Sequence, residues 1–165
     1  MKRAGFSLIE LVVVVAIMGT LLSIATIYFS QWNRKAQIES KTREIYDALN
    51  EARLNSIYIK KQHRITFQPN SYSLKRYESG DDATGTDVYS RNTTYLLSLS
   101  GGASIADIFF EFDIRGTTSN LNTIYLNPVA SGAVFDCIVI HVARTNMGQG
   151  TDTNHDGKPD SCTIK

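Results

Sequence analysis

The sequence predicts an α+β protein in which one long N-terminal helix packs on an antiparallel β-sheet head. Residues 6–30 are almost entirely apolar, and residues 31–59 contain no proline or glycine and repeat apolar side chains at helical spacing. After Lys61 the spacing changes to the two-residue period of strands. A run of strands after one long helix is typical of α+β architecture.

The apolar segment has the length of a membrane span. Residues 11–29 would form roughly 28 Å of helix at 1.5 Å per residue, about the thickness of one bilayer core. Lys2 and Arg3 precede this segment, so we expect the N-terminus to stay in the cytoplasm and the rest of the chain to cross the membrane. The formal net charge of +1 gives no bulk attraction to nucleic acid or to a membrane surface.

One carboxylate, that of Glu10, interrupts the apolar segment. An acidic residue at the centre of a membrane helix costs about 2.5 to 3.5 kcal/mol, and the cost is smaller near the start of the span, where Glu10 lies. A lone acid in such a position is a candidate functional residue that needs a partner.

The stretch Gly5-Phe6-Ser7-Leu8-Ile9-Glu10 resembles the processing site of type IV prepilins and pseudopilins. The resemblance implies that residues 1–5 are a leader, that a membrane prepilin peptidase cuts between Gly5 and Phe6, and that it methylates the new amino terminus. It also implies that Glu10 pairs with the Phe6 amine of a neighbouring subunit in a filament. The pair could instead close within one subunit, because residues four apart share one helix face. The alternative is an ordinary signal peptide or signal anchor, which should show a small-x-small cleavage site after its apolar core and no internal glutamate.

The helix is expected to continue beyond the membrane to about Ile59. Apolar or small side chains recur there at spacings of three, four and seven residues, which is an amphipathic stripe. They are Ile38, Ile45, Leu49, Ala52, Ser56 and Ile59. Residues 6–30 would then be the transmembrane and filament-core helix, and residues 31–61 an amphipathic half that packs into the head. This layout resembles that of a type IV pilin, with a hydrophobic stem and a stem base packed into a globular head.

Residues 62–165 are predicted to form the β-rich head. A hairpin is expected from strands at residues 63–68 and 72–77, and a polar loop at residues 79–87. Further strands are expected at residues 93–99, 108–112, 123–126 and 135–142.

The combination of Ile65-Thr66-Phe67 with Phe112-Asp113-Ile114-Arg115-Gly116 resembles the GspH/FimT branch of minor pilins and pseudopilins. That branch shows a short early strand and a Phe-x-x-x-Gly turn before a later strand. The chain departs from the branch at residues 144–148, where a glycine-arginine hairpin is common, and from major pilins in having no proline in its stem.

The two cysteines, Cys137 and Cys162, would both lie outside the cytoplasm, where disulfides persist. A bond between them encloses 24 residues (162 − 137 − 1) and contributes on the order of 3 kcal/mol in the chain-entropy model. The alternative is two unrelated free thiols.

Residues 152–160 resemble the calcium loops of EF-hands, and more closely the helix-free DxNxDGxxD loops of extracellular modules. Oxygen-bearing side chains stand at loop positions one, three, five and nine, and a glycine at position six permits the sharp turn. The expected ligands are the side chains of Asp152, Asn154, Asp156 and Asp160 and the backbone carbonyl of Lys158. Thr163 replaces the usual acidic ligand at position twelve, so affinity for calcium should be weak. The alternative is an Asp-Gly turn in a solvated loop.

Two function classes fit the sequence. The first is structural: a minor pilin or pseudopilin of a type IV pilus or a type II secretion pseudopilus, whose partners are other pilins and the prepilin peptidase. The second is a filament-tip module that binds DNA, a surface or a secretion substrate. DNA is the least expected of these ligands, because the last forty residues hold only Arg144, Lys158 and Lys165 as fixed cations. We do not expect an enzyme, because the sequence carries no catalytic constellation, phosphate loop or paired-acid motif.

The resemblance also implies a location. The chain would first be a single-pass protein of the bacterial inner membrane, with a cytoplasmic N-terminus and a periplasmic head. It would then become part of a periplasmic or extracellular filament.

Overall fold

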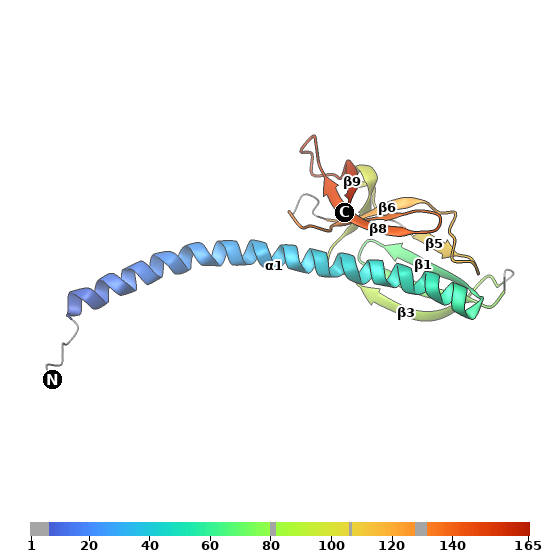
Figure 1. Cartoon of the computed structure of the whole chain (residues 1–165), viewed down its shortest axis with the longest axis horizontal. Helices are drawn as coiled ribbons and strands as arrows, with labels where there is room; N and C mark the ends of the chain where they lie inside the picture. Colours follow the sequence, from blue (N-terminus) through green and yellow to red (C-terminus); the bar gives the residue numbers. More distant parts are fainter. Residues whose placement is uncertain (1–6, 80–81, 106, 128–131) are drawn as a thin grey trace. The chain divides into compact units, whose positions relative to one another are not determined.

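The computed structural model describes residues 7–79, 82–105, 107–127 and 132–165, with the backbone alone at residues 24–27. It confirms the α+β fold class, because a long helix, α1 (Leu8–Ile59), is followed by two antiparallel sheets (Figure 1). The chain divides into two compact units, Met1–Arg34 and Lys35–Lys165. The predicted end of the helix near Ile59 is confirmed, and the next residue, Lys60, leaves helical geometry with a positive φ of 56°.

The first sheet of the head has the strand order β3-β2-β1-β5. Its strands are β1 (Gln62–Gln68), β2 (Ser71–Tyr77), β3 (Thr86–Asn92) and β5 (Ile108–Phe112). The second sheet has the order β4-β6-β7-β8-β9, and a 3-10 turn, η1 (Ser100–Gly102), follows β4. Its strands are β4 (Leu97–Leu99), β6 (Asn122–Leu126), β7 (Cys137–Ile140), β8 (Thr145–Thr151) and β9 (Ser161–Ile164).

Several predicted strands are confirmed. β1 and β2 form the expected hairpin, in register from Gln62 opposite Tyr77 to Gln68 opposite Ser71. β5 has the predicted bounds, and β6 and β7 lie within or beside the segments expected to form strands. β1 and β2 alternate partly buried and buried side chains, and most side chains of β6 and β7 are buried, so the apolar pattern of these strands is strong.

Other parts of the strand prediction are wrong. The strand expected at residues 93–99 is only the three-residue β4, and the sequence does not predict β3, β8 or β9. β3 is an edge strand whose side chains are exposed except for Tyr89, so it lacks an alternating apolar pattern. β8 contains two glycines, Gly148 and Gly150, which normally weaken a strand.

The second half of α1 supplies one wall of the head's core. Its buried stripe agrees with the prediction at Ile38, Ile45, Leu49, Ala52 and Ser56. Ile59 is an error, because its side chain is 47% exposed at the end of the helix. The facing residues come from both sheets and include Ile65, Phe67, Leu74, Phe110, Phe112, Ile124, Leu126, Ile138 and Ile140.

The stripe also contains a buried threonine that apolar spacing alone does not reveal. Thr42 is fully buried, and its hydroxyl lies 2.9 Å from the Ile38 carbonyl oxygen and 3.1 Å from that of Phe135. This side chain therefore joins α1 to the segment that leads into β7. A buried hydroxyl is tolerated here because it is hydrogen-bonded.

The expected Phe-x-x-x-Gly turn follows β5 and lies against α1. Asp113 organises it, since its side-chain Oδ1 accepts hydrogen bonds from the backbone N–H groups of Arg115 and Thr117. Gly116 has a φ of 77°, and a Cβ at this position would lie 2.6 Å from Cδ1 of Ile57. Only glycine fits both the left-handed backbone and the close approach to the helix.

Candidate functional site

The residues before the helix include the predicted cleavage position. Gly5 and Phe6 lie outside the described residues, so the structure gives no geometry for the cut itself. Ser7 is the first described residue and caps α1: its Oγ accepts a hydrogen bond from the Glu10 backbone N–H at 3.3 Å. The Ser7 carbonyl accepts a hydrogen bond from the Leu11 N–H, also at 3.3 Å.

Glu10 occupies the third position of the helix, where an acid has two favourable environments. Ser7-Leu8-Ile9-Glu10 has the sequence of a capping box, in which serine or threonine is followed three residues later by glutamate or glutamine. The positive end of the helix dipole also favours a carboxylate in the first turn. Its side chain is exposed, so a charged group outside the helix can approach it.

The first part of α1 presents apolar side chains in every direction. Large apolar residues from Leu8 to Trp32 that the structure describes are between 44% and 82% exposed. Among the described residues, α1 is the one helix long and apolar enough to cross a membrane. An exposed apolar surface of this extent marks contact with a membrane or with other protein chains.

Two small polar residues within this part, Thr20 and Ser23, have hydrogen-bonded hydroxyl groups. Thr20 donates to the Ile17 carbonyl and Ser23 donates to the Gly19 carbonyl, each at 2.8 Å. Hydroxyls that bond to the preceding turn can enter lipid without an unpaired polar group. A Cβ at Gly19 would meet nothing within 4 Å, so this point on the surface of the helix has room for a side chain or for close packing of another helix.

The N-terminal segment matches a known family model. Residues 1–26 match the model described as the prokaryotic N-terminal methylation motif. The chain carries a type IV pilin-like prepilin signal. No curated protein and no solved structure gives a significant match. The matched prepilin signal includes Gly5, Phe6 and Glu10, and it ends before the head begins.

A disulfide joins Cys137 of β7 to Cys162 of β9, the pairing that the sequence predicts. These strands are not neighbours, because β8 lies between them. Next-nearest strands of a flat sheet are about 9.5 Å apart, but the two cysteine Cα atoms are 6.2 Å apart. The sheet therefore curls around β8.

Glycines make that curl possible. Gly148 is the β8 partner of Cys137, and Gly150 is the β8 partner of Cys162. β8 therefore has no side chain at either position opposite a cysteine. A Cβ at Gly148 would lie 2.8 Å from Sγ of Cys162 and 2.4 Å from the Thr163 carbonyl oxygen.

A buried carboxyl group lies next to this disulfide. Asp136 is fully buried, its Oδ1 accepts a hydrogen bond from the Gly150 N–H, and its Oδ2 has no hydrogen-bond partner among the described residues. Burial raises the pKa of Asp136 against the opposing effect of the Gly150 hydrogen bond. The folded state therefore favours the protonated carboxyl group. The contribution of Asp136 to the free energy of unfolding is lost as the pH rises through its raised folded-state pKa.

The proposed calcium ligands lie in the loop between β8 and β9. The Asp152 carboxylate accepts hydrogen bonds from the N–H groups of Asp156 at 3.1 Å and Gly157 at 2.9 Å. The Asn154 side-chain oxygen also accepts from the Asp156 N–H, and the Asp160 carboxylate accepts from the Thr153 N–H at 2.7 Å. Gly157 has a φ of 81°, which agrees with the sharp turn expected at this position.

This conformation only partly suits a calcium ion. Calcium needs six to eight oxygen ligands, whereas the side-chain oxygens of Asp152, Asn154 and Asp160 are directed at backbone N–H groups. In the part of the chain that the structure describes, no three histidine, cysteine, aspartate or glutamate side chains are grouped closely enough to hold a metal ion. To bind a metal ion, these side-chain oxygens would have to give up their hydrogen bonds to backbone N–H groups and contact the ion instead.

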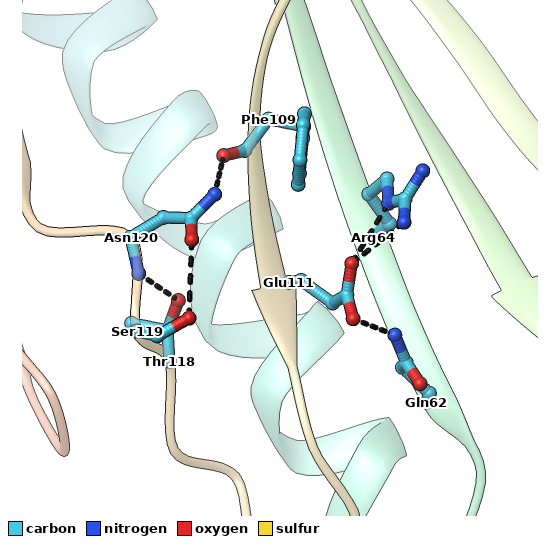
Figure 2. A network of polar contacts seen from close by, with 7 residues as sticks. All are labelled: Gln62, Arg64, Phe109, Glu111, Thr118, Ser119 and Asn120. Carbon is cyan, nitrogen blue, oxygen red and sulfur yellow. Dashed lines mark hydrogen bonds and ion pairs between the residues drawn. The ribbon is translucent and has the colours of Figure 1, made fainter. Parts of the chain in front are cut away.

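The head also contains a polar network at the outer strand β5 that sequence reasoning misses (Figure 2). Arg64 of β1 lies over the ring of Phe109, 4.5 Å from its centroid, and its Nη2 is 2.7 Å from the Glu111 carboxylate. Gln62 donates to the same carboxylate. Asn120 donates from Nδ2 to the Phe109 carbonyl at 2.9 Å and so covers part of the open edge of β5.

A hollow of about 270 Å³ lies between this edge and the segment around Leu121. Its lining is apolar at Phe109 and Leu121 and polar at Asn120 and Asn122. Arg64 and Glu111 are 47 positions apart in the chain, so no local sequence motif could have revealed the network. These groups stabilise the edge of β5. Within the described head, they do not form the hydrogen-bonded chain of nucleophile, base and orienting acid that a catalytic triad needs.

Proposed function

We propose that this chain is a subunit of a type IV pilus or a type II secretion pseudopilus. In this proposal prepilin peptidase cuts after Gly5, the Phe6 amine is methylated, and the apolar part of α1 holds the chain in the inner membrane before assembly. The observation that carries the proposal is the methylation motif at residues 1–26, which includes the first part of an exposed apolar helix. Such a chain is a structural protein and not an enzyme, and its partners are other pilins.

Within that class we propose a minor pilin or pseudopilin of the GspH/FimT type. The Phe-x-x-x-Gly segment at residues 112–116 supports this assignment, because it forms a turn in which the Gly116 N–H donates to the Asp113 carbonyl at 2.8 Å. The exposed first part of α1 also supports assembly through the helix, since its described large apolar side chains present a surface that can pack against the helices of other subunits.

Processing gives the direct test of the proposal. The mature protein purified from membranes should begin at Phe6 and carry one additional methyl group, as measured by intact mass and N-terminal peptide mass. Protein from cells that lack prepilin peptidase should keep Met1 and serves as the control. An intact Met1 in peptidase-competent cells, or a cut beyond Phe29, would contradict the proposal.

We also propose that the loop at residues 152–160 binds calcium weakly. The supporting observation is the tight turn, in which the Asp152 carboxylate accepts hydrogen bonds from the N–H groups of Asp156 and Gly157, loop positions five and six. Asp152, Asp156 and Asp160 would supply carboxylate oxygens, and Asn154 and the Lys158 carbonyl the remaining protein ligands. The disulfide closes the ring that contains this loop, so it lowers the ordering cost of the bound conformation.

Calcium removal tests this second proposal. The melting temperature of the head should rise by a few degrees when calcium replaces a chelator, which corresponds to about 1 kcal/mol for a domain of this size. The double variant Asp152→Asn, Asp156→Asn should abolish the rise, whereas Asp87→Asn in the exposed β3 strand should leave it unchanged. Magnesium should be a poor substitute, because it demands rigid octahedral geometry. A melting temperature indifferent to calcium and chelator would remove the metal proposal.

A further inference from the structure

The apolar part of α1 ends in a group of exposed aromatic side chains. Tyr28, Phe29 and Trp32 are 70%, 65% and 66% exposed, and the rings of Phe29 and Trp32 lie 6.4 Å apart between centroids. Arg34 follows two residues later. Over residues 28–34 the helix therefore changes from a mostly apolar surface, through exposed aromatic side chains, to a charged one.

We propose that Tyr28, Phe29 and Trp32 anchor the unassembled chain at the phospholipid headgroup layer on the side of the membrane that carries the head. This inference rests on the proposed function, because it concerns the chain while it is held in the membrane. Tyrosine and tryptophan favour this layer, since their rings pack against acyl chains while the hydroxyl or indole N–H meets water and headgroups. The guanidinium of Arg34 complements anionic lipid phosphates at the same level.

The anchor determines the depth of Glu10. Trp32 and Glu10 are 22 residues apart (32 − 10), which corresponds to about 33 Å along a helix. The hydrocarbon core of a bilayer is about 30 Å thick. With Trp32 in one headgroup layer, Glu10 therefore lies at the opposite headgroup layer and not within the hydrocarbon.

This placement explains how the unassembled helix can remain in the membrane although it carries the Glu10 carboxylate. At the boundary, the Glu10 carboxylate keeps contact with water and lipid headgroups. It would lose that contact only on entering the interior of a filament, where the amine of another subunit can replace it. The aromatic anchor would thus keep the unassembled stem at a depth that leaves Glu10 available.

Trp32 is the sole tryptophan of the chain, so its fluorescence reports the depth directly. We would reconstitute the full-length, processed protein at low density in vesicles of phosphatidylcholine and phosphatidylglycerol. Part of the phosphatidylcholine would carry bromine either near the headgroup or near the end of the acyl chain. Trp32 should be quenched at least twofold more strongly by the shallow bromines than by the deep ones.

The matched control is the double variant Trp32→Phe, Leu21→Trp, which moves the tryptophan by eleven residues, or about 16 Å along the helix. Its quenching order should be the reverse. Equal or stronger quenching of Trp32 by deep bromines would overturn the anchor. Quenching by water-soluble acrylamide without any quenching by lipid bromines would also overturn it, because Trp32 would then lie in water.

The mass of the same sample separates this inference from the proposed function. A mature methylated Phe6 together with a deep or water-exposed Trp32 would leave the pilin proposal standing and reject the anchor. An uncleaved chain with shallow quenching would reject the processing proposal and leave the anchor standing.

Discussion

A chain that carries Glu10→Ala should be cleaved and inserted normally but should enter filaments at less than about a tenth of the wild-type level. The physical reason is that the Phe6 amine of a subunit in the filament interior would lose its counter-charge. Removing one member of a buried charge pair costs about 3 to 5 kcal/mol, and about 1.4 kcal/mol already corresponds to a factor of ten. Membrane insertion should be no worse, because the substitution deletes a charge from the apolar segment. The measurement is the ratio of sheared filament protein to membrane-bound protein.

Glu10→Gln separates pairing from helix capping. Glutamine can take the place of glutamate in a capping box with Ser7, so a capping role would survive this substitution. Pairing with an amine requires the negative charge, so Glu10→Gln should fail in assembly as Glu10→Ala does. Ser7→Ala provides the converse control, since it removes the cap and keeps the charge. Wild-type assembly of Glu10→Gln would show that Glu10 has no pairing role.

Removal of the disulfide should lower the stability of the head substantially. The double variant Cys137→Ser, Cys162→Ser should lower the free energy of unfolding of residues 31–165 by about 3 kcal/mol, because the unfolded chain regains the entropy of a closed loop. β9 should be affected first, since among the described strands it pairs with β8 alone, at the edge of the second sheet. Denaturant unfolding measures the global change, and hydrogen exchange of β9 amides measures the local one.

Reduction of the wild-type protein is the matched control, because it opens the same bond without a substitution. Reduced wild type and the double serine variant should unfold at the same denaturant midpoint. Gly148→Ala should also destabilise the oxidised protein, since its Cβ would meet Cys162 Sγ and the Thr163 backbone. If reduction leaves the midpoint unchanged, the bond makes no contribution to the stability of the head.

The sequence predicts the helix well because its signals are long and repeated. An apolar run followed by an amphipathic stripe determines both the existence of α1 and its end at Ile59. The hairpin β1–β2 is equally visible, because its strands alternate and Pro69 and Asn70 break them. The cysteine pair is also predictable, from the location that the leader implies and not from local geometry.

The remaining features depend on contacts between residues distant in sequence. β3 is stabilised by its pairing with β2 and has little apolar pattern of its own. β8 contains glycines that its own propensity disfavours, but they are needed where Cys137 and Cys162 approach each other. The spacing of acidic residues at 152–160 predicts a calcium loop. The carboxylate oxygens of Asp152 and Asp160 accept hydrogen bonds from backbone N–H groups, and residue spacing does not reveal these bonds.

The curl of the second sheet has a mechanical consequence. A pull on the C-terminal end would ordinarily unzip β9 from β8 one hydrogen bond at a time. Here the load at Cys162 passes through a covalent bond into β7, a strand held by neighbours on both sides. The outermost strand is thus fastened to the middle of the sheet, and force applied there must shear several strands together instead of peeling one.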